Sequence, residues 1–349
     1  MRLSLLCILI CICTSVSASV SWHDGDLASA FAAAEASERN ACVVFVKENC
    51  GHCKHLVNQV LPHPVVVAQL DRMVVVRIEM DSHDGQAWSA DIGVSSSPSI
   101  VVLQAATEVD RIIGVPGHED LARLLEDYLA GRNTIGDLQQ RLQENPNDPE
   151  IMLPLARKFG DRQRFDETFA LFDHIIEVDP DNESALADDA IYLKGAYLQR
   201  QMAMPRDAIS VLRAGLDRFP TADKSAFMYY RMALAYRDLN DASGLVIAYT
   251  VYRERLPENA LIHRSTANML TKLNVTDKAV QRTAAVAGKM AMELEPQNPK
   301  NFRIAAIALA LAGDNAAACD AIERAIELMP ENRDFRRLHA HLLQKREDK

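Results

Sequence analysis

The sequence predicts two domains, a small α/β domain followed by an all-α array of helical repeats. Strand-like apolar segments alternate with helical segments through residues 19–131. A Cys-x-x-Cys motif, Cys50-Gly51-His52-Cys53, comes shortly after the first of those strands. From residue 149 onward, prolines at helix ends recur at intervals of 34–40 residues, and the interval from Pro296 to Pro330 equals the 34-residue period of a known helical repeat.

Residues 1–18 have the pattern of a secretory signal. Arg2 precedes an apolar run that ends near Cys13, and the small residues before Ser19 predict cleavage after Ala18. The run is shorter than the ~20 apolar residues that a spanning helix needs, so we expect no membrane span after cleavage. The pattern therefore predicts a periplasmic or secreted protein.

Composition argues against some classes of partner and indicates the role of the cysteines. The net charge of −10 and the pI near 5.5 argue against nucleic acid or an anionic membrane as the main partner. Three of the seven cysteines fall in the signal, and four are too few for a disulfide scaffold. We expect Cys42 and Cys319 to be buried apolar side chains. The close pair Cys50 and Cys53 is then the candidate redox centre.

The first domain is expected to form a central sheet with helices around it. A strand at 41–47 directs the motif to the domain surface, and a helix begins at the motif. Unpaired N–H groups at that helix start lower the pKa of the first thiol, and the thiolate is the species that attacks disulfides. The other predicted segments are a helix at 26–37, the end of the motif helix at Pro62 and Pro64, a strand at 73–78, a helix at 87–92, a strand within 94–103, a strand at 109–113 and a helix at 119–128.

Residues 21–131 resemble the thioredoxin superfamily, on the evidence of Cys50-Gly51-His52-Cys53-Lys54 and of Ser97-Pro98. The resemblance implies that Cys50 is the surface nucleophile and that Cys53 resolves the mixed disulfide. It also implies a cis Ser97–Pro98 bond against the disulfide, with the Ser97 backbone pairing with an extended substrate. Protein disulfide isomerases carry the same dipeptide, Gly-His, that stands here as Gly51-His52. A thiolate stabilised by His52 makes the reduced pair more stable and the disulfide more oxidising, which favours oxidation or isomerisation of client proteins. No cofactor is implied.

Two positions depart from the superfamily pattern. Many members have a buried acid six residues before the first cysteine, where this chain has Val44. Deprotonation of Cys53 would then need Lys47, Glu48 or a water molecule. Asn49 replaces the usual aromatic residue, which makes the rim of the site more polar.

Other functions stay open because of Val44. The chain could be a protein-binding scaffold or chaperone with a structural disulfide, or it could deliver copper. Cys50, His52, Cys53 and His55 lie within six residues, but no distant further ligand stands out, so we predict no metal site.

The second half resembles the tetratricopeptide repeat (TPR) family. After a linker helix and turn at 132–148, residues 149–349 fit about five repeats and a C-terminal capping helix. The fold class is thus an α/β thioredoxin fold followed by an all-α TPR solenoid. The resemblance implies a protein or peptide ligand in the TPR groove, in addition to protein clients with thiols or disulfides. The repeats end at Pro180, Pro220, Pro257, Pro296 and Pro330.

Two sets of residues in the array have a predicted location. Phe227, Tyr230 and Arg237 lie at helical spacings that could place them together on the groove face, so they are the candidate partner-binding residues. His263, His339 and His341 fit no site pattern, and we expect them at the surface.

Overall fold

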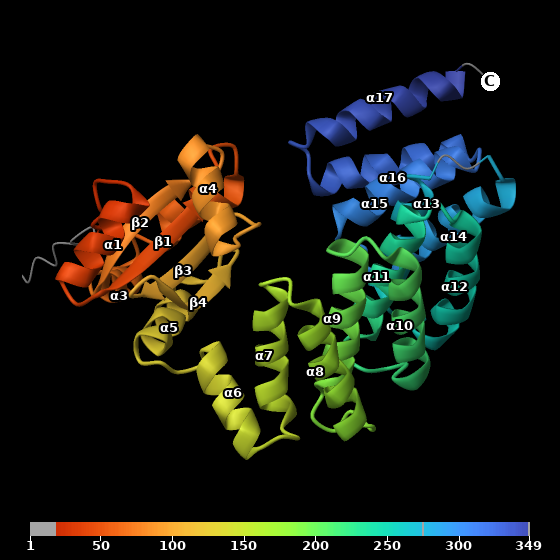
Figure 1. The fold of residues 1–349 in the computed structure, drawn as a ribbon. Coiled ribbons are helices and arrows are strands. Elements are labelled where there is room, and N and C mark those ends of the chain that lie inside the picture. The colour runs from red at the N-terminus through yellow and green to blue at the C-terminus, as the bar shows by residue number, and fades with distance from the viewer. Residues whose placement is uncertain (1–18, 274–275, 348–349) are drawn as a thin grey trace, which may run out of the picture. The chain divides into compact units, whose positions relative to one another are not determined.

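The computed structural model describes residues 19–273 and 276–347 (Figure 1). The predicted signal, residues 1–18, lies outside the described residues. Contacts divide the chain into two units, the first comprising residues up to Pro146 with Arg157–Arg164, and the second comprising Asn147–Ala156 with the rest. No helix among the described residues is long and apolar enough to cross a membrane.

The first unit is built on a four-stranded sheet with the strand order β2-β1-β3-β4. Strand β1 is parallel to β2 and antiparallel to β3, and β3 and β4 form an antiparallel hairpin. The elements are α1 (Leu27–Ala36), β1 (Asn40–Val46), α2 (Gly51–His55), the π-helical turn η1 (Leu56–Val60), α3 (Pro64–Leu70), β2 (Met73–Glu79), α4 (His83–Ile92), β3 (Ser99–Gln104), β4 (Thr107–Ile113), α5 (His118–Leu129) and α6 (Ile135–Glu144).

Helices cover both faces of this sheet, which explains the continuous apolar run of β1. Alternate residues of a strand face opposite sides. Val44 and Val46 therefore pack with α2, η1, α3 and α5, whereas Val43 and Phe45 pack with α1 and α4. Both layers hold β1 in place, so the chain leaves its carboxyl end at a fixed position just before Cys50.

One helix was not predicted, and one helix boundary differs from the sequence prediction. The motif helix ends before Pro62, as expected, but a further helix, α3, begins at Pro64. Proline fits the first position of a helix, where an N–H would have no partner in the helix. Helix α4 begins at His83 instead of near 87, because the Ser82 side chain caps it by accepting the Gly85 N–H at 3.0 Å.

A buried ionic cluster joins β4 to residues 157–164 within the first unit. Asp110 of β4 is completely buried. Its carboxylate lies 2.7 Å from Lys158 Nζ and 2.7 Å from Arg162 Nη2, and it also accepts the Arg111 N–H at 2.8 Å. Residues 157–164 follow the predicted start of the repeats at 149, and their contacts group them with the first unit.

Asp161 gives this unit a testable pH dependence. Burial outweighs the attraction of Arg162 and Lys158 and raises the pKa of Asp161 from 3.8 to about 6. The folded state therefore holds this proton more tightly than the unfolded state, and the carboxyl lowers stability as pH rises from about 4 to 6. Asp161→Asn is expected to stabilise the unit by about 1–3 kcal/mol at pH 8 and to have little effect at pH 4.

Urea unfolding followed by tryptophan fluorescence measures this effect, because both tryptophans, Trp22 and Trp88, belong to the first unit. Asp120→Asn, at an exposed residue, is the control. An equal gain at pH 4 and pH 8 would contradict the assignment to Asp161.

The second unit is a stack of paired helices, as the repeat pattern predicted. First helices of successive repeats pack side by side, α9 with α11, α11 with α13 and α13 with α15. Small residues allow the close approach, since a Cβ on Gly288 would lie 2.8 Å from the Ala305 Cα atom. The first helix, α7 (Pro149–Gly160), belongs to this unit up to Ala156. The others are α8 (Phe165–Val178), α9 (Ala187–Arg200), α10 (Pro205–Arg218), α11 (Ser225–Asp238), α12 (Ala242–Arg255), α13 (Ala260–Leu270), α14 (Lys278–Leu294), α15 (Pro299–Leu311), α16 (Asn315–Leu328) and α17 (Arg333–Glu347).

The expectation that His263 lies at the surface was wrong. Its side chain is 1% exposed, with Nδ1 2.8 Å from the Tyr249 hydroxyl and Nε2 2.9 Å from the Pro257 carbonyl oxygen. Burial lowers the pKa of His263, and both ring nitrogens have partners. His263 therefore belongs to the core of the array.

Candidate active site

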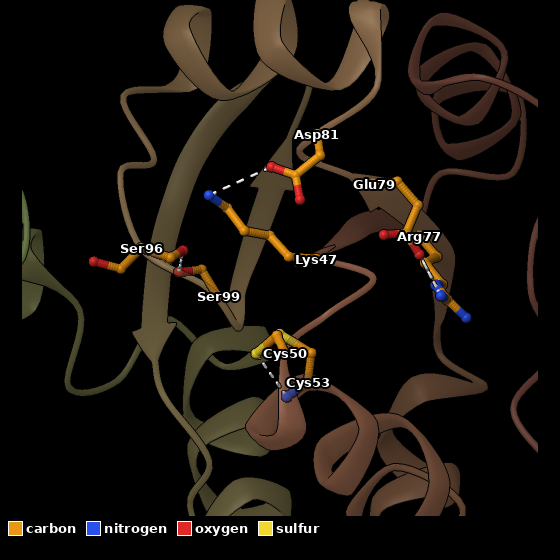
Figure 2. The surroundings of a disulfide bond; sticks show 8 residues. All are labelled: Lys47, Cys50, Cys53, Arg77, Glu79, Asp81, Ser96 and Ser99. Carbon is orange, nitrogen blue, oxygen red and sulfur yellow. Dashed lines mark hydrogen bonds and ion pairs between the residues drawn. A yellow bond between two sulfur atoms is a disulfide. The ribbon is translucent and has the colours of Figure 1, made fainter.

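The two cysteines of the motif form a disulfide at the carboxyl end of β1 (Figure 2). Cys50 is the N-cap of α2, and its extended backbone places the sulfur over the helix start. Cys50 Sγ accepts the Cys53 N–H at 3.1 Å. Cys50 is partly exposed and Cys53 is only 2% exposed. The arrangement presents one sulfur to solvent and stabilises negative charge on it through a backbone donor and the helix dipole.

The remaining predicted site residues lie around this disulfide. Gly51 and His52 are exposed in the first turn of α2. The Ser97–Pro98 peptide bond is cis, which confirms the prediction. The residues that flank it, Ser96 and Ser99, lie in the surroundings of the disulfide (Figure 2), and Ser99 Oγ donates to the Ser96 carbonyl oxygen at 2.7 Å.

Val44 contributes an apolar side chain, and not an acid, to the surroundings of Cys53. Val44 is fully buried in the same apolar cluster as Cys53. Lys47 is engaged by Asp81 at 3.5 Å, and Arg77 pairs with Glu79 (Figure 2). These charged side chains lie toward the ends of β1 and β2.

Two further thiols of the described residues lie outside the motif. Cys42 and Cys319 are buried, and burial raises the pKa of Cys42 to about 12, so its thiol stays protonated. Within residues 19–273 and 276–347, no group of three or more His, Cys, Asp or Glu side chains is placed to hold a metal ion.

The predicted partner-binding residues all lie on α11. Phe227 is 47% exposed, and Tyr230 and Arg237 are partly exposed. The structure adds Tyr192 of α9, whose ring centroid lies 6.2 Å from that of Phe227 in an edge-to-face contact. Sequence reasoning missed Tyr192, although it precedes Phe227 by about one repeat length, which is a usable signal.

Comparison with known proteins identifies the family of the first domain. A family model described as thioredoxin-like matches residues 21–105. The chain is 30% identical over 87 residues to a thioredoxin from Chlamydia caviae, a match that covers 24% of this chain and 78% of that protein. It is 31% identical over 93 residues to a thioredoxin from Mycolicibacterium smegmatis, covering 27% and 81%. The chain belongs to the thioredoxin family through this domain.

Solved structures show similarity to each part of the chain. A thioredoxin from Thermus thermophilus has 28% identity and a TM-score of 0.29, and the match covers 32% of this chain and 86% of that one. YrrB, described as a TPR protein with an unusual peptide-binding site, has 15% identity and a TM-score of 0.41, with 60% and 100% covered. PilW, described as a type IV pilus biogenesis factor, has 12% identity and a TM-score of 0.42, with 62% and 95% covered. In this chain the thioredoxin domain is followed by a stack of paired helices, the arrangement expected of the predicted TPR array.

Proposed function

We propose that this protein is an exported thiol–disulfide oxidoreductase whose TPR array binds a protein partner. One observation carries the proposal: the thioredoxin domain presents a partly exposed Cys50 at a helix N-cap, disulfide-bonded to a buried Cys53. A structural disulfide needs neither this difference in exposure nor a thiolate-stabilising donor. The signal pattern supports export to a compartment where such a pair is held oxidised.

The exchange reaction has two steps that use both sulfurs. The Cys50 thiolate attacks one sulfur of a client disulfide, and the other client sulfur leaves as a thiolate with the bond's electron pair. The Cys53 thiolate then attacks Cys50 Sγ, which releases the client and re-forms the disulfide. Oxidation of a client dithiol is the reverse sequence, and the Ser97 backbone would pair with the client main chain in either direction.

The TPR array would raise the local concentration of a client or partner near Cys50. Phe227, Tyr230 and Arg237 would contact that ligand, together with the neighbouring Tyr192. The exposed ring of Phe227 supports this role, because together with the adjacent Tyr192 ring it offers a ligand an aromatic surface.

Cys53→Ser tests the enzymatic proposal directly. The variant keeps the attacking thiol but cannot resolve the mixed disulfide, so clients are expected to accumulate as reductant-sensitive adducts on Cys50. Non-reducing electrophoresis and mass spectrometry of the protein isolated from its native host measure these adducts. A variant with both cysteines replaced is the control, and a Cys53→Ser protein without adducts would contradict exchange chemistry.

A further inference from the structure

Resolution of the mixed disulfide, the second step of the proposed function, requires that the Cys53 thiol lose its proton. The Cys53 side chain is 2% exposed. On its sheet side it shares an apolar cluster with Val44 and Val46, which can neither accept a proton nor stabilise a thiolate. The proton therefore has to leave by another route.

A pocket of about 140 Å³ reaches Cys53 from the solvent side. This volume has room for a few water molecules, each of which takes up about 30 Å³ in the liquid. Three cationic side chains, from Lys47, Lys54 and Arg77, line the pocket and favour a thiolate at its inner end. The only carboxylate among its lining residues is that of Glu48.

Two nearby acids, Asp81 and Glu79, do not line the pocket. Asp81 pairs with Lys47 at 3.5 Å, and Glu79 pairs with Arg77 through Oε1, while its Oε2 is buried without a hydrogen-bond partner. Both acids are held in ion pairs outside the pocket, whereas Glu48 lines the pocket and lies in the turn that directly precedes Cys50.

We propose that Glu48 accepts the Cys53 proton through water in this pocket, while the three cations stabilise the thiolate. The Cys53 thiolate attacks Cys50 Sγ, the bond between Cys50 and the client sulfur breaks, and the client leaves with the electron pair. In the reverse direction Cys53 is the leaving group, and the same route returns its proton. The role of the missing buried acid is thereby taken by a side chain that lines the same pocket as Cys53.

A chromogenic aromatic disulfide separates the two steps in one stopped-flow experiment. Attack by Cys50 of the reduced protein releases a first coloured thiolate, and resolution by Cys53 releases a second. Glu48→Gln is expected to slow the second release by about 10-fold at pH 6–7. This is below the 10²–10⁴-fold typical of general bases because the group acts through water. The first release should change by less than about 2-fold.

Two further readouts distinguish proton transfer from a structural effect. Added imidazole buffer should accelerate the second release of Glu48→Gln and leave that of the wild-type protein unchanged, and Glu48→Asp should restore most of the rate. Glu35→Gln, which removes an exposed carboxylate before the opposite end of β1, is the matched control and should behave as wild type.

The inference is wrong if Glu48→Gln resolves at the wild-type rate, or if Glu79→Gln produces the loss in its place. It is also wrong if buffer accelerates both proteins equally. Absence of a first release from the wild-type protein would overturn the proposed function itself, and this inference with it.

Discussion

Cys50→Ser is expected to reduce disulfide exchange by a factor on the order of 10³ or more, to the level of the solution reaction. The serine hydroxyl keeps the shape of the N-cap, so α2 should stay capped while the nucleophile is lost. Cys53 cannot replace it, because its side chain lies beneath the surface among apolar neighbours. Reduction of insulin with dithiothreitol as the electron donor measures this activity.

Cys42→Ala is the matched control for the loss of a thiol. Cys42 lies in β1 of the same domain, and its raised pKa keeps it a protonated, unreactive side chain. This variant should retain wild-type exchange. Equal activity of Cys50→Ser and wild type would mean that the motif does not carry the reaction.

Asp110→Ala is expected to destabilise the first unit by about 3–5 kcal/mol, because it removes one member of a buried ion-pair cluster. Lys158 loses its carboxylate partner, and Arg162 loses one of two. The charges of both side chains, which are only 13% exposed, are then poorly compensated. The buried N–H of Arg111 also loses its side-chain acceptor.

The tryptophan-detected urea transition measures this loss within the first unit. Asp120→Ala is the control, because its ion pair with Arg123 is largely exposed and should contribute less than about 1 kcal/mol. Equal midpoints for both variants would show that the Asp110 cluster does not stabilise the unit.

The fold prediction rests on local sequence patterns. The features that it missed depend on contacts between residues that are far apart in the sequence. The strand before Cys50 and the periodic helix pairs follow from residues close together in sequence. Asp110 and Lys158 are 48 residues apart, and no local pattern indicates that they form a pair. The burial of His263 likewise depends on Tyr249, a neighbour from the preceding helix.

The candidate site shows the same division. Cys50, Cys53 and the cis Ser97–Pro98 bond were expected from the motif and the family resemblance. The sequence offered Lys47, Glu48 and water equally as substitutes for the acid missing at Val44. Only the structure brings Glu48 and Cys53 to one pocket, because pocket lining depends on how the turn after β1 folds against α2.

Equilibration of the native protein with glutathione redox buffers tests the central claim most directly. The reduced fraction of Cys50 and Cys53 would be measured by alkylation and mass spectrometry. We predict a reversible transition of the pair within the range of these buffers, in the folded protein, with Cys42 and Cys319 unchanged. A pair that stays oxidised in excess reduced glutathione, and is reduced only on unfolding, would be a structural disulfide and would contradict the account.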